Sequence, residues 1–380
     1  MSTPTLEQVN AALAGVQDPE IKRPITELNM VDNVTIDDGR VAVKVLLTVA
    51  GCPMKDTITR ETTAAVSAIP GVTGVDVELG VMDSDQRAGL QEMLRGGQAQ
   101  REIPFAQAGS LTKVFAIASG KGGVGKSSVT VNLAVAMAHQ GLKVGIVDAD
   151  IYGHSVPAML GVADSRPTQV EELIMPVPTA SGVSVISIGM LKPKREQVVA
   201  WRGPMLDRAL VQMLSDVYWG DLDVLLLDLP PGTGDIAISL GQHLPNAEVV
   251  VVTTPQEAAA EVAERAGTMA SMMHQRVVGV LENMSYLTLP DGERMEVFGS
   301  GGGDRVAHTL SQRFGYDVPV LGQVPLDTAL REGGDAGKPI VEADPAAPAA
   351  QVLTKVAADL SGRGRGLAGM QLGLTPSSKF

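Results

Sequence analysis

Apolar residues in the larger part of the chain follow two alternating patterns. Short continuous apolar runs are separated by longer stretches in which apolar residues recur at helical spacing. The runs favour strands buried on both faces, and the longer stretches favour helices that cover them. The expected strands are Val114–Ala118, Val144–Asp148, Val183–Ile188, Val224–Leu229, Val249–Thr253, Val277–Leu281 and Val318–Gly322, and the expected helices include Ser128–Gln140, Met205–Ser215, Ile236–Leu244, Glu257–Met273 and Asp304–Phe314. This order predicts an α/β fold with a doubly wound, mainly parallel sheet that binds ligands at the carboxyl ends of its strands.

The first part of the chain has its own pattern and predicts a small α/β domain over residues 1–82. A helix over Leu6–Gly15 precedes a hairpin whose strands, Val34–Ile36 and Val41–Val49, flank an Asp-Gly turn. A second helix over Met54–Ile69 and a strand over Val72–Leu79 complete it. Residues 83–110 are polar and predict an exposed helix with a linker, 111–362 form the large domain, and the glycine-rich 363–380 is expected to be a flexible tail.

Composition and charge limit the possible binding partners of the protein and its cellular compartment. The formal net charge is −13 with a pI near 4.9, which argues against a broad footprint on nucleic acid. Cys52 is the only cysteine, so no internal disulfide can form and a reducing compartment is expected. The N-terminus lacks a basic, apolar signal and the apolar runs are too short to span a membrane, so we expect a cytoplasmic protein without stable membrane association.

The clearest functional motif is a predicted phosphate-binding loop over residues 120–128. Its two glycines are separated by four residues and followed by Lys126 and Ser127, and it lies between a predicted strand and a predicted helix. Glycines let backbone N–H groups close on phosphate oxygens, Lys126 faces the β- and γ-phosphates, and Ser127 is a ligand for Mg²⁺. The residues expected to bind ATP here are Gly120, Lys121, Gly122, Gly123, Val124, Gly125, Lys126, Ser127 and Ser128.

Carboxylates follow two further predicted strands. Asp148 is expected near the metal shell, and Asp150 is expected to orient or deprotonate the attacking water. Asp228 ends a strand that runs into a Pro-Pro-Gly loop, where it can hold Mg²⁺ and Gly232 can sense the γ-phosphate. Either aspartate alone would be more simply read as a helix N-cap, but two of them after a phosphate loop favour a hydrolytic site.

Lys121 stands directly after the first glycine of the loop. The resulting Gly-Lys-Gly-Gly-Val-Gly-Lys-Ser resembles the deviant Walker A of the nitrogenase iron protein, MinD and ParA class. That resemblance implies a homodimer in which Lys121 reaches the phosphates bound by the partner and acts with Lys126 and Asp150 in ATP hydrolysis. The alternative is a solvated loop lysine.

Further motifs resemble the Mrp/ApbC proteins, which are P-loop ATPases regarded as iron–sulfur cluster carriers. They are Asp148-Ala-Asp150-Ile-Tyr-Gly, Trp201-Arg-Gly-Pro-Met205, Asp228-Leu-Pro-Pro-Gly-Thr-Gly-Asp235 and Glu282-Asn-Met-Ser-Tyr286. In the small domain, Asp18-Pro19-Glu20 and Gly51-Cys52-Pro53 resemble the FSCA domain of iron–sulfur assembly proteins. The resemblance implies that Asn283 bonds the adenine edge, although a polar strand cap explains its position as well.

The chain departs from that family at the cluster site. The family's Cys-x-x-Cys would fall where Leu289 and Gly292 stand, and neither side chain can ligate iron. His154, where proline is commoner, has no assigned role. Cys52, beside the start of the second helix, is the remaining candidate cluster ligand, because a helix N-terminus favours the thiolate.

The sequence therefore predicts a Mg²⁺-dependent ATP hydrolase that binds iron–sulfur clusters and transfers them to apoprotein clients, with assembly proteins as further partners. Two alternatives stay open. One is an ATPase adaptor that recruits clients without holding a cluster, and the other is a positioning ATPase like MinD or ParA.

Overall fold

The computed structural model describes residues 4–48, 54–95, 102–107, 109–151, 153–191 and 203–363 of the 380-residue chain. These residues fall into two compact units. The first unit comprises residues 1–102 together with 166–178 and 215–220, and the second comprises 103–165, 179–214 and 221–380. Cys52 and the tail beyond residue 363 lie outside the described residues.

The second unit is built on a parallel sheet whose strands run in the order β15-β12-β11-β4-β10-β5-β9. The strands are β4 (Lys113–Ser119), β5 (Val144–Asp148), β9 (Ser184–Ser187), β10 (Val224–Asp228), β11 (Glu248–Thr253), β12 (Arg276–Glu282) and β15 (Val320–Gln323). Most of their side chains are buried, as their continuous apolar runs predict for strands covered on both faces.

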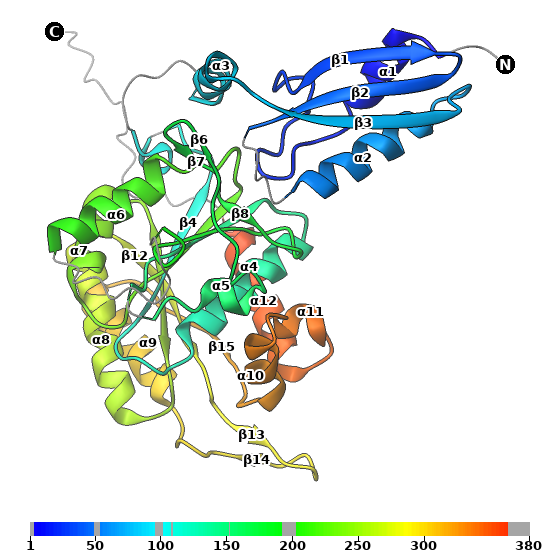
Figure 1. Ribbon diagram of the computed structural model, residues 1–380. Coiled ribbons are helices and arrows are strands. Elements are labelled where there is room, and N and C mark those ends of the chain that lie inside the picture. Colours follow the sequence, from blue (N-terminus) through cyan, green and yellow to red (C-terminus); the bar gives the residue numbers. More distant parts are fainter. Residues whose placement is uncertain are drawn as a thin grey trace, which may run out of the picture. The chain divides into compact units, whose positions relative to one another are not determined.

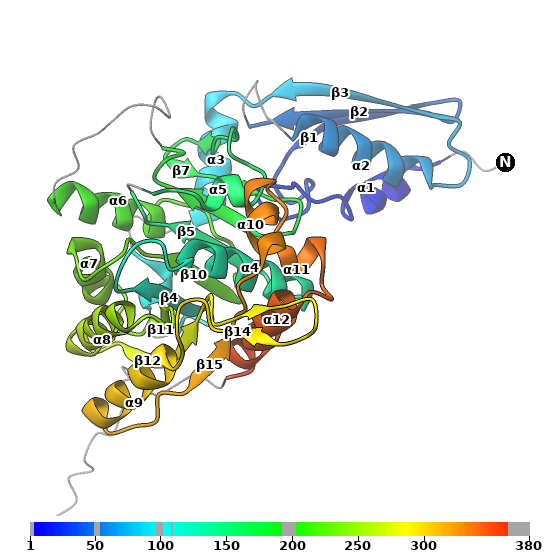
Figure 2. The ribbon, with the colours of Figure 1, turned by 90° about the horizontal axis from the view of Figure 1, so that it is seen from below.

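Helices cover both faces of this sheet. Figures 1 and 2 show α7, α8 and α9 on one face and α4 and α12 on the other. The helices are α4 (Lys126–His139), α5 (Val156–Met159), α6 (Gly203–Ser215), α7 (Asp235–His243), α8 (Glu257–Met272), α9 (Gly302–Phe314), α10 (Thr328–Asp335), α11 (Ile340–Ala343) and α12 (Pro348–Gly362), with a short 3₁₀ turn over Pro104–Ala106. The predicted doubly wound α/β fold is confirmed.

Strand order and register determine where a ligand can bind. The chain leaves β4 toward β5 on one side of the sheet and later passes from β10 to β11 on the other side, so the strand order reverses around β4. Asp228 pairs with Asp148 and with Ile117, so the carboxyl ends of β10, β5 and β4 lie side by side. A crevice at such a reversal is the usual ligand site of an open α/β sheet.

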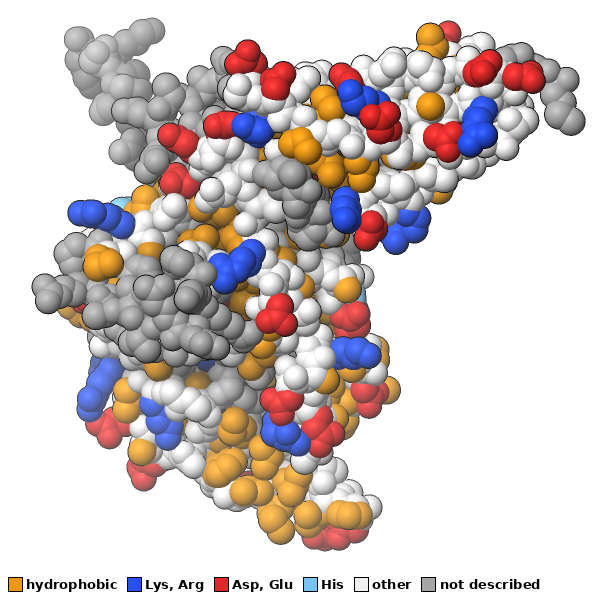
Figure 3. Space-filling view, in the orientation of Figure 1, with side chains coloured by type: hydrophobic (Ala, Val, Ile, Leu, Met, Phe, Trp, Pro, Cys, Tyr) orange, Lys and Arg blue, Asp and Glu red, His pale blue; other side chains and the backbone are white. Residues whose placement is uncertain are grey.

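Between β12 and α9 the second unit carries a hairpin that the hydrophobic pattern does not predict. Its strands are β13 (Leu287–Thr288) and β14 (Arg294–Met295). Met295 and Val297 are 49% and 45% exposed, and orange side chains gather over this end of the molecule in Figure 3. Leu289 and Gly292, where the resemblance implies cysteines, lie between these two strands.

The first unit contains a three-stranded sheet with helices packed against it. The elements are α1 (Leu6–Leu13), β1 (Val31–Asp37), β2 (Arg40–Leu47), α2 (Lys55–Ser67), β3 (Gly74–Val81) and α3 (Ser84–Arg95). Strands β1 and β2 are antiparallel around the predicted Asp38-Gly39 turn, whose two residues have φ angles of 43° and 81°. Both angles are positive, as a two-residue hairpin turn requires.

The segment 166–178 from the middle of the chain contributes to the core of the first unit. The strands β6 (Gln169–Val170) and β7 (Leu173–Ile174) form a short hairpin, and β8 (Val177–Pro178) follows it. Val170, Leu173 and Met175 are at most 5% exposed and belong to the same apolar cluster as the cores of α1, β2 and α2. No helix among the described residues is long and apolar enough to cross a membrane.

Candidate nucleotide-binding site

The phosphate loop joins β4 to α4 at the centre of the sheet, as the sequence predicts. Gly123 and Gly125 have φ angles of 82° and 81°, which side chains with a Cβ rarely adopt. At Gly120 a Cβ would lie 2.3 Å from the Val262 backbone of α8, so only glycine permits this close approach. The loop therefore presents its backbone to a ligand instead of side chains.

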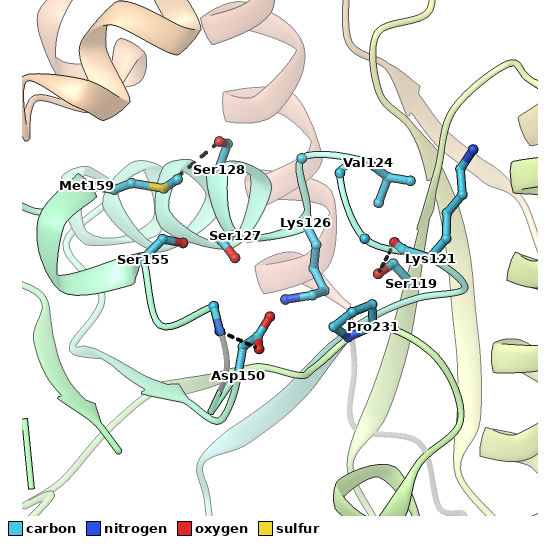
Figure 4. Close-up of a pocket in the computed structure, with 14 residues that line it drawn as sticks. Ser119, Lys121, Val124, Lys126, Ser127, Ser128, Asp150, Ser155, Met159 and Pro231 are labelled. Atoms are coloured by element: carbon cyan, nitrogen blue, oxygen red, sulfur yellow. Dashed lines mark hydrogen bonds between the residues drawn. The ribbon is translucent and has the colours of Figure 1, made fainter. Parts of the chain in front are cut away.

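A pocket of about 240 Å³ opens beside the loop. Lys121, Gly122, Gly123, Val124, Gly125, Lys126, Ser127, Ser128 and Asp150 of the predicted residues line it, together with Ser119, Gly153, Ser155, Met159 and Pro231. In Figure 4 the side chains of Lys126 and Asp150 point into the space between the loop and the segment after β5. Gly120, Asp148, Asp228, Gly232 and Asn283 are not among the lining residues.

Beneath the pocket, Asp228 contacts three polar side chains from the first turns of α4. Ser127 Oγ donates to Asp228 Oδ2 at 2.6 Å, and Thr130 Oγ1 donates to Asp228 Oδ1 at 2.8 Å. Lys126 Nζ also lies 2.8 Å from Asp228 Oδ1, and the two side chains are only 6% and 0% exposed. The fold thus brings the phosphate-loop lysine, the serine hydroxyl and the β10 aspartate into one cluster, in which the lysine and the aspartate are buried.

The contact between Lys126 and Asp228 is close, but it lacks the directional geometry of a hydrogen bond. Among the described residues, Lys126 Nζ has no hydrogen-bond partner although it is buried. Asp228 places one negative charge beside the ammonium, but its N–H donors are costly to leave buried without hydrogen-bond acceptors, and phosphate oxygens can accept from them. Its position at the open end of the loop fits a nucleotide phosphate, and Ser127 with Asp228 supplies the oxygen ligands that Mg²⁺ prefers.

Asp148 is fully buried at the end of β5. Burial raises its pKa well above the usual value for an aspartate, the neighbouring Asp228 adds to that rise, and the bond donated by Ser187 opposes it. Ser187 Oγ donates to Asp148 Oδ2 at 3.1 Å, and the Asp150 backbone N–H donates to Oδ1 at 3.2 Å. Asp148 therefore fixes the chain at the turn from β5 to Asp150.

Asp150 is half-buried and lines the pocket opposite Lys126. The Gly153 N–H donates to its Oδ1 at 3.0 Å, so its carboxylate is held by the segment that follows β5. The role of this carboxylate toward an attacking water stays a prediction.

Lys121 has a contact of its own outside the phosphate site. Its Nζ donates to Gln256 Oε1 at 3.0 Å, just before α8, and Figure 4 shows its side chain directed away from Lys126. Within one copy of the chain, Lys121 and Lys126 thus face different directions. Such an arrangement is compatible with a lysine that acts on another copy.

Gly232 and Asn283 both donate hydrogen bonds to backbone carbonyls, one just before the phosphate loop and one within it. The Gly232 N–H donates to the Ser119 carbonyl at 2.8 Å, and Asn283 Nδ2 donates to the Val124 carbonyl at 2.9 Å. Asn283 Oδ1 is buried and has no hydrogen-bond partner among the described residues. The amide of Asn283 therefore supports the loop while keeping one acceptor unused, and its contact with adenine stays a prediction.

Several residues of this region were not predicted from the sequence. They are Thr130 and Ser187, which bond the two buried aspartates, Gln256, which holds Lys121, and Ser155 and Met159 of the segment after β5. The only available signal was the position of Thr130 one helical turn after Lys126, since the other four depend on which strand ends and loops meet in the fold.

The described residues offer no obvious cluster site. Leu289 and Gly292 lie in the tight turn between β13 and β14, where the Gly292 N–H donates to the Leu289 carbonyl at 2.9 Å. No group of three or more His, Cys, Asp or Glu side chains in the described part of the chain could hold a metal ion. His154 packs closely on the Gly189 backbone, where a Cβ would lie 2.8 Å from its ring.

Comparisons with known proteins agree with this architecture. The family described as NUBPL iron-transfer P-loop NTPase matches residues 110–361, and the family described as iron–sulfur cluster assembly protein matches residues 6–78. The iron–sulfur cluster carrier protein of Mycobacterium bovis is 59% identical over 372 residues, which cover 98% of this chain and 97% of that protein. The protein of the same name from Synechocystis sp. is 41% identical and covers 94% of this chain and 98% of that protein.

A solved structure adds a ligand-bound relative. The nucleotide-binding protein from Archaeoglobus fulgidus in complex with ADP is 36% identical, with a TM-score of 0.53, over 63% of this chain and 93% of that chain. The fold and the phosphate loop thus define a P-loop NTPase. The chain belongs to the NUBPL iron-transfer P-loop NTPase family, with an iron–sulfur assembly domain at its N-terminus, and the resemblance seen in the motifs is confirmed.

Proposed function

We propose that the protein is an ATP-binding and ATP-hydrolysing iron–sulfur cluster carrier that delivers clusters to apoprotein clients. The main support for nucleotide binding is the buried Lys126 ammonium, which faces the phosphate loop and has no hydrogen-bond partner among the described residues. The carrier part is supported by the relatives named iron–sulfur cluster carrier protein.

The proposed division of labour follows the geometry. Lys126 and the loop N–H groups bind the β- and γ-phosphates, and Ser127 with Asp228 holds Mg²⁺, which would neutralise phosphate charge. Asp150 orients the attacking water, and Asp148 holds the segment that carries Asp150. Gly232 would exchange its bond to the Ser119 carbonyl for one to the γ-phosphate, which would make the loop after β10 sensitive to the nucleotide.

Substitution of Lys126 tests the nucleotide assignment. Lys126→Ala removes the main counter-charge of the phosphates, so ATP and ADP binding and ATP turnover should be lost. Lys355→Ala is the matched control, because Lys355 is a 73% exposed lysine of α12 that pairs with Asp359. Isothermal titration with ADP and a phosphate-release assay measure both effects. Turnover of Lys126→Ala at the rate of the unsubstituted protein would refute the assignment.

Iron and sulfide analysis separates a carrier from an adaptor. The hairpin from β13 to β14 offers no thiol at Leu289 or Gly292, so a cluster would need Cys52 from each copy of a homodimer together with ligands from a partner. Anaerobically purified protein that has been loaded with iron and sulfide should retain both, and Cys52→Ser should retain neither. Loaded protein without iron but with normal ATP turnover would favour the adaptor, which binds clients without a cluster.

A further inference from the structure

Glu282 is a buried carboxylate to which the nucleotide chemistry assigns no role. It ends β12, is 1% exposed, and directly precedes Asn283. Its Oε2 accepts from the Gly303 N–H at 2.6 Å, and its Oε1 accepts from Gln323 Nε2 at 3.2 Å. One side chain therefore joins the ends of β12 and β15 to the first turn of α9.

The start of α9 is shaped to receive that carboxylate. A Cβ on Gly303 would lie 2.9 Å from Glu282 Cβ, and one on Gly302 would lie 2.6 Å from the carbonyl oxygens of Thr254 and Pro255. The two glycines thus let the helix terminus sit directly on the ends of β11 and β12. The first N–H groups of a helix lack partners within the helix and attract negative charge, and here Glu282 supplies it.

The backbone at Glu282 connects this junction to the phosphate loop. The Glu282 carbonyl accepts from the Val324 N–H at 2.8 Å, and the Asn283 N–H donates to the Thr253 carbonyl at 2.8 Å. From that position Asn283 Nδ2 reaches the Val124 carbonyl, and a Cβ on Gly125 would lie only 2.2 Å from the same nitrogen. The fit between Asn283 and the loop leaves little freedom, so it depends on how the end of β12 is held.

The same carboxylate closes the base of the hairpin between β12 and α9. The hairpin leaves the sheet just after Glu282 and returns at Gly303, which is bonded to Glu282.

We infer that Glu282 is a positioning residue for the nucleotide site, which acts by holding Asn283 against the phosphate loop. This inference rests on the proposed function, because it assumes that the loop binds nucleotide. Glu282 itself does not line the pocket. Its substitution should therefore weaken nucleotide binding only through Asn283.

A double-mutant cycle with the full chain tests the inference by isothermal titration with Mg-ADP. Glu282→Ala leaves the Gly303 N–H and the Gln323 amide without their partner and should weaken ADP binding on the order of tenfold. Glu282→Gln keeps the shape of the side chain but removes the charge from the helix terminus, so its loss of ADP affinity should be smaller. It replaces Glu282→Ala in the experiment if that variant does not fold. Asp304→Asn is the matched control, since it removes an exposed carboxylate from the same turn of α9 and should leave the affinity unchanged.

The decisive comparison is made in the Asn283→Ala background. If Glu282 acts through Asn283, Glu282→Gln should cost less than about twofold there, although it weakens binding in the unsubstituted protein. A purely structural role would give the same loss in both backgrounds and would overturn the inference, as would unchanged affinity in Glu282→Gln and Glu282→Ala. Failure of the unsubstituted protein to bind ADP would instead overturn the proposed function, and this inference with it.

Discussion

Asp228 shows how one side chain organises the nucleotide site. It accepts hydrogen bonds from Ser127 and Thr130 and lies 2.8 Å from the Lys126 ammonium, all in a fully buried position. Breaking a buried ion pair by removing one charge costs about 3–5 kcal/mol, because the other charge stays buried without a partner. Asp228 thus contributes to stability as well as to the proposed Mg²⁺ site.

Asp228→Asn should therefore have two effects. Nucleotide-free protein should unfold at a lower temperature than the unsubstituted protein, and added nucleotide should recover part of the loss because phosphates then neutralise Lys126. The dependence of turnover on Mg²⁺ should weaken more than ADP affinity does. Thermal unfolding with and without ADP, and turnover over a Mg²⁺ series, measure these effects. Equal unfolding temperatures without nucleotide would show that the Lys126–Asp228 pair stabilises nothing.

At the same scale, the sequence was most informative where chemistry is local. Lys126, Ser127 and the loop glycines are neighbours in the chain, so their spacing alone brings them to one pocket. Asp148 and Asp228 were predicted because each ends an apolar strand. The partners Thr130, Ser187 and Gln256 were missed, because nothing in their own sequence context distinguishes them from ordinary helix, strand-end or loop residues.

Glu20 in the first unit is a buried carboxylate whose titration affects stability. It is 7% exposed and accepts from Thr168 Oγ1 at 2.9 Å. Burial raises the pKa of Glu20 to about 7, the nearby Asp18 adds to the rise, and the Thr168 bond opposes it. The pKa of Asp18 is raised by burial as well, against bonds from the Glu20 and Ile21 N–H groups.

Because the folded pKa of Glu20 lies above its unfolded value, the folded state binds more protons between pH 4.5 and about 7. Stability should fall as pH rises through that window, by on the order of 3 kcal/mol at most, since each pKa unit is worth about 1.4 kcal/mol. Glu20→Gln should flatten this fall, making it more stable than the unsubstituted protein at pH 8 but not at pH 5. Glu27→Gln, at a 54% exposed site, is the control. Denaturant unfolding at both pH values measures the difference, and parallel pH profiles for Glu20→Gln and the unsubstituted protein would contradict it.

At the scale of elements, the strands were predicted well and the short hairpins were not. Strands β5, β10 and β11 consist mainly of Val, Leu and Ile, and their predicted ends agree with the structure to within one residue. The β13–β14 and β6–β7 hairpins consist of two-residue strands with mixed composition, so no periodic signal could reveal them. Their pairing depends on tertiary contacts instead.

The β6–β7 hairpin has a structural consequence for the first unit. Leu173 is 5% exposed and packs in the same apolar cluster as the N-terminal sheet, although it lies far along the chain. Arg87 of α3 also pairs with Glu171 at 3.0 Å. The N-terminal segment alone therefore lacks part of its own core.

Leu173→Ala should destabilise the first unit by about 2–5 kcal/mol, because a buried leucine leaves a cavity when it is truncated. Leu111→Ala removes the same atoms from a residue that is 84% exposed, and it should have no measurable effect. Hydrogen exchange of the β1, β2 and β3 amides in the full chain reports on this unit specifically. Equal protection in both variants would mean that the hairpin does not support the N-terminal core.

At the scale of the whole molecule, we propose that two copies of the chain act together in ATP hydrolysis. The resemblance of the loop to the deviant Walker A class implies that Lys121 acts on the partner's phosphates. Within one copy, Lys121 donates to Gln256 at 3.0 Å and is directed away from Lys126. On closure of a dimer, Lys121 would exchange its hydrogen bond to the neutral Gln256 amide for one to a charged phosphate. A hydrogen bond to a charged acceptor is stronger, so bound phosphate would favour this exchange.

Lys121→Ala should therefore bind ADP with unchanged affinity and yet fail in hydrolysis. A transition-state charge supplied by a partner is worth roughly 10³–10⁵ in rate in other NTPases, so the single-turnover rate should fall by about that range. Gln256→Ala is the matched control, because it removes the partner of Lys121 within one copy but leaves the lysine free to cross, and it should keep the rate. Sedimentation with ATP should detect a dimer for the control and not for Lys121→Ala. A single-turnover rate for Lys121→Ala equal to that of the unsubstituted protein would show that Lys121 has no catalytic part.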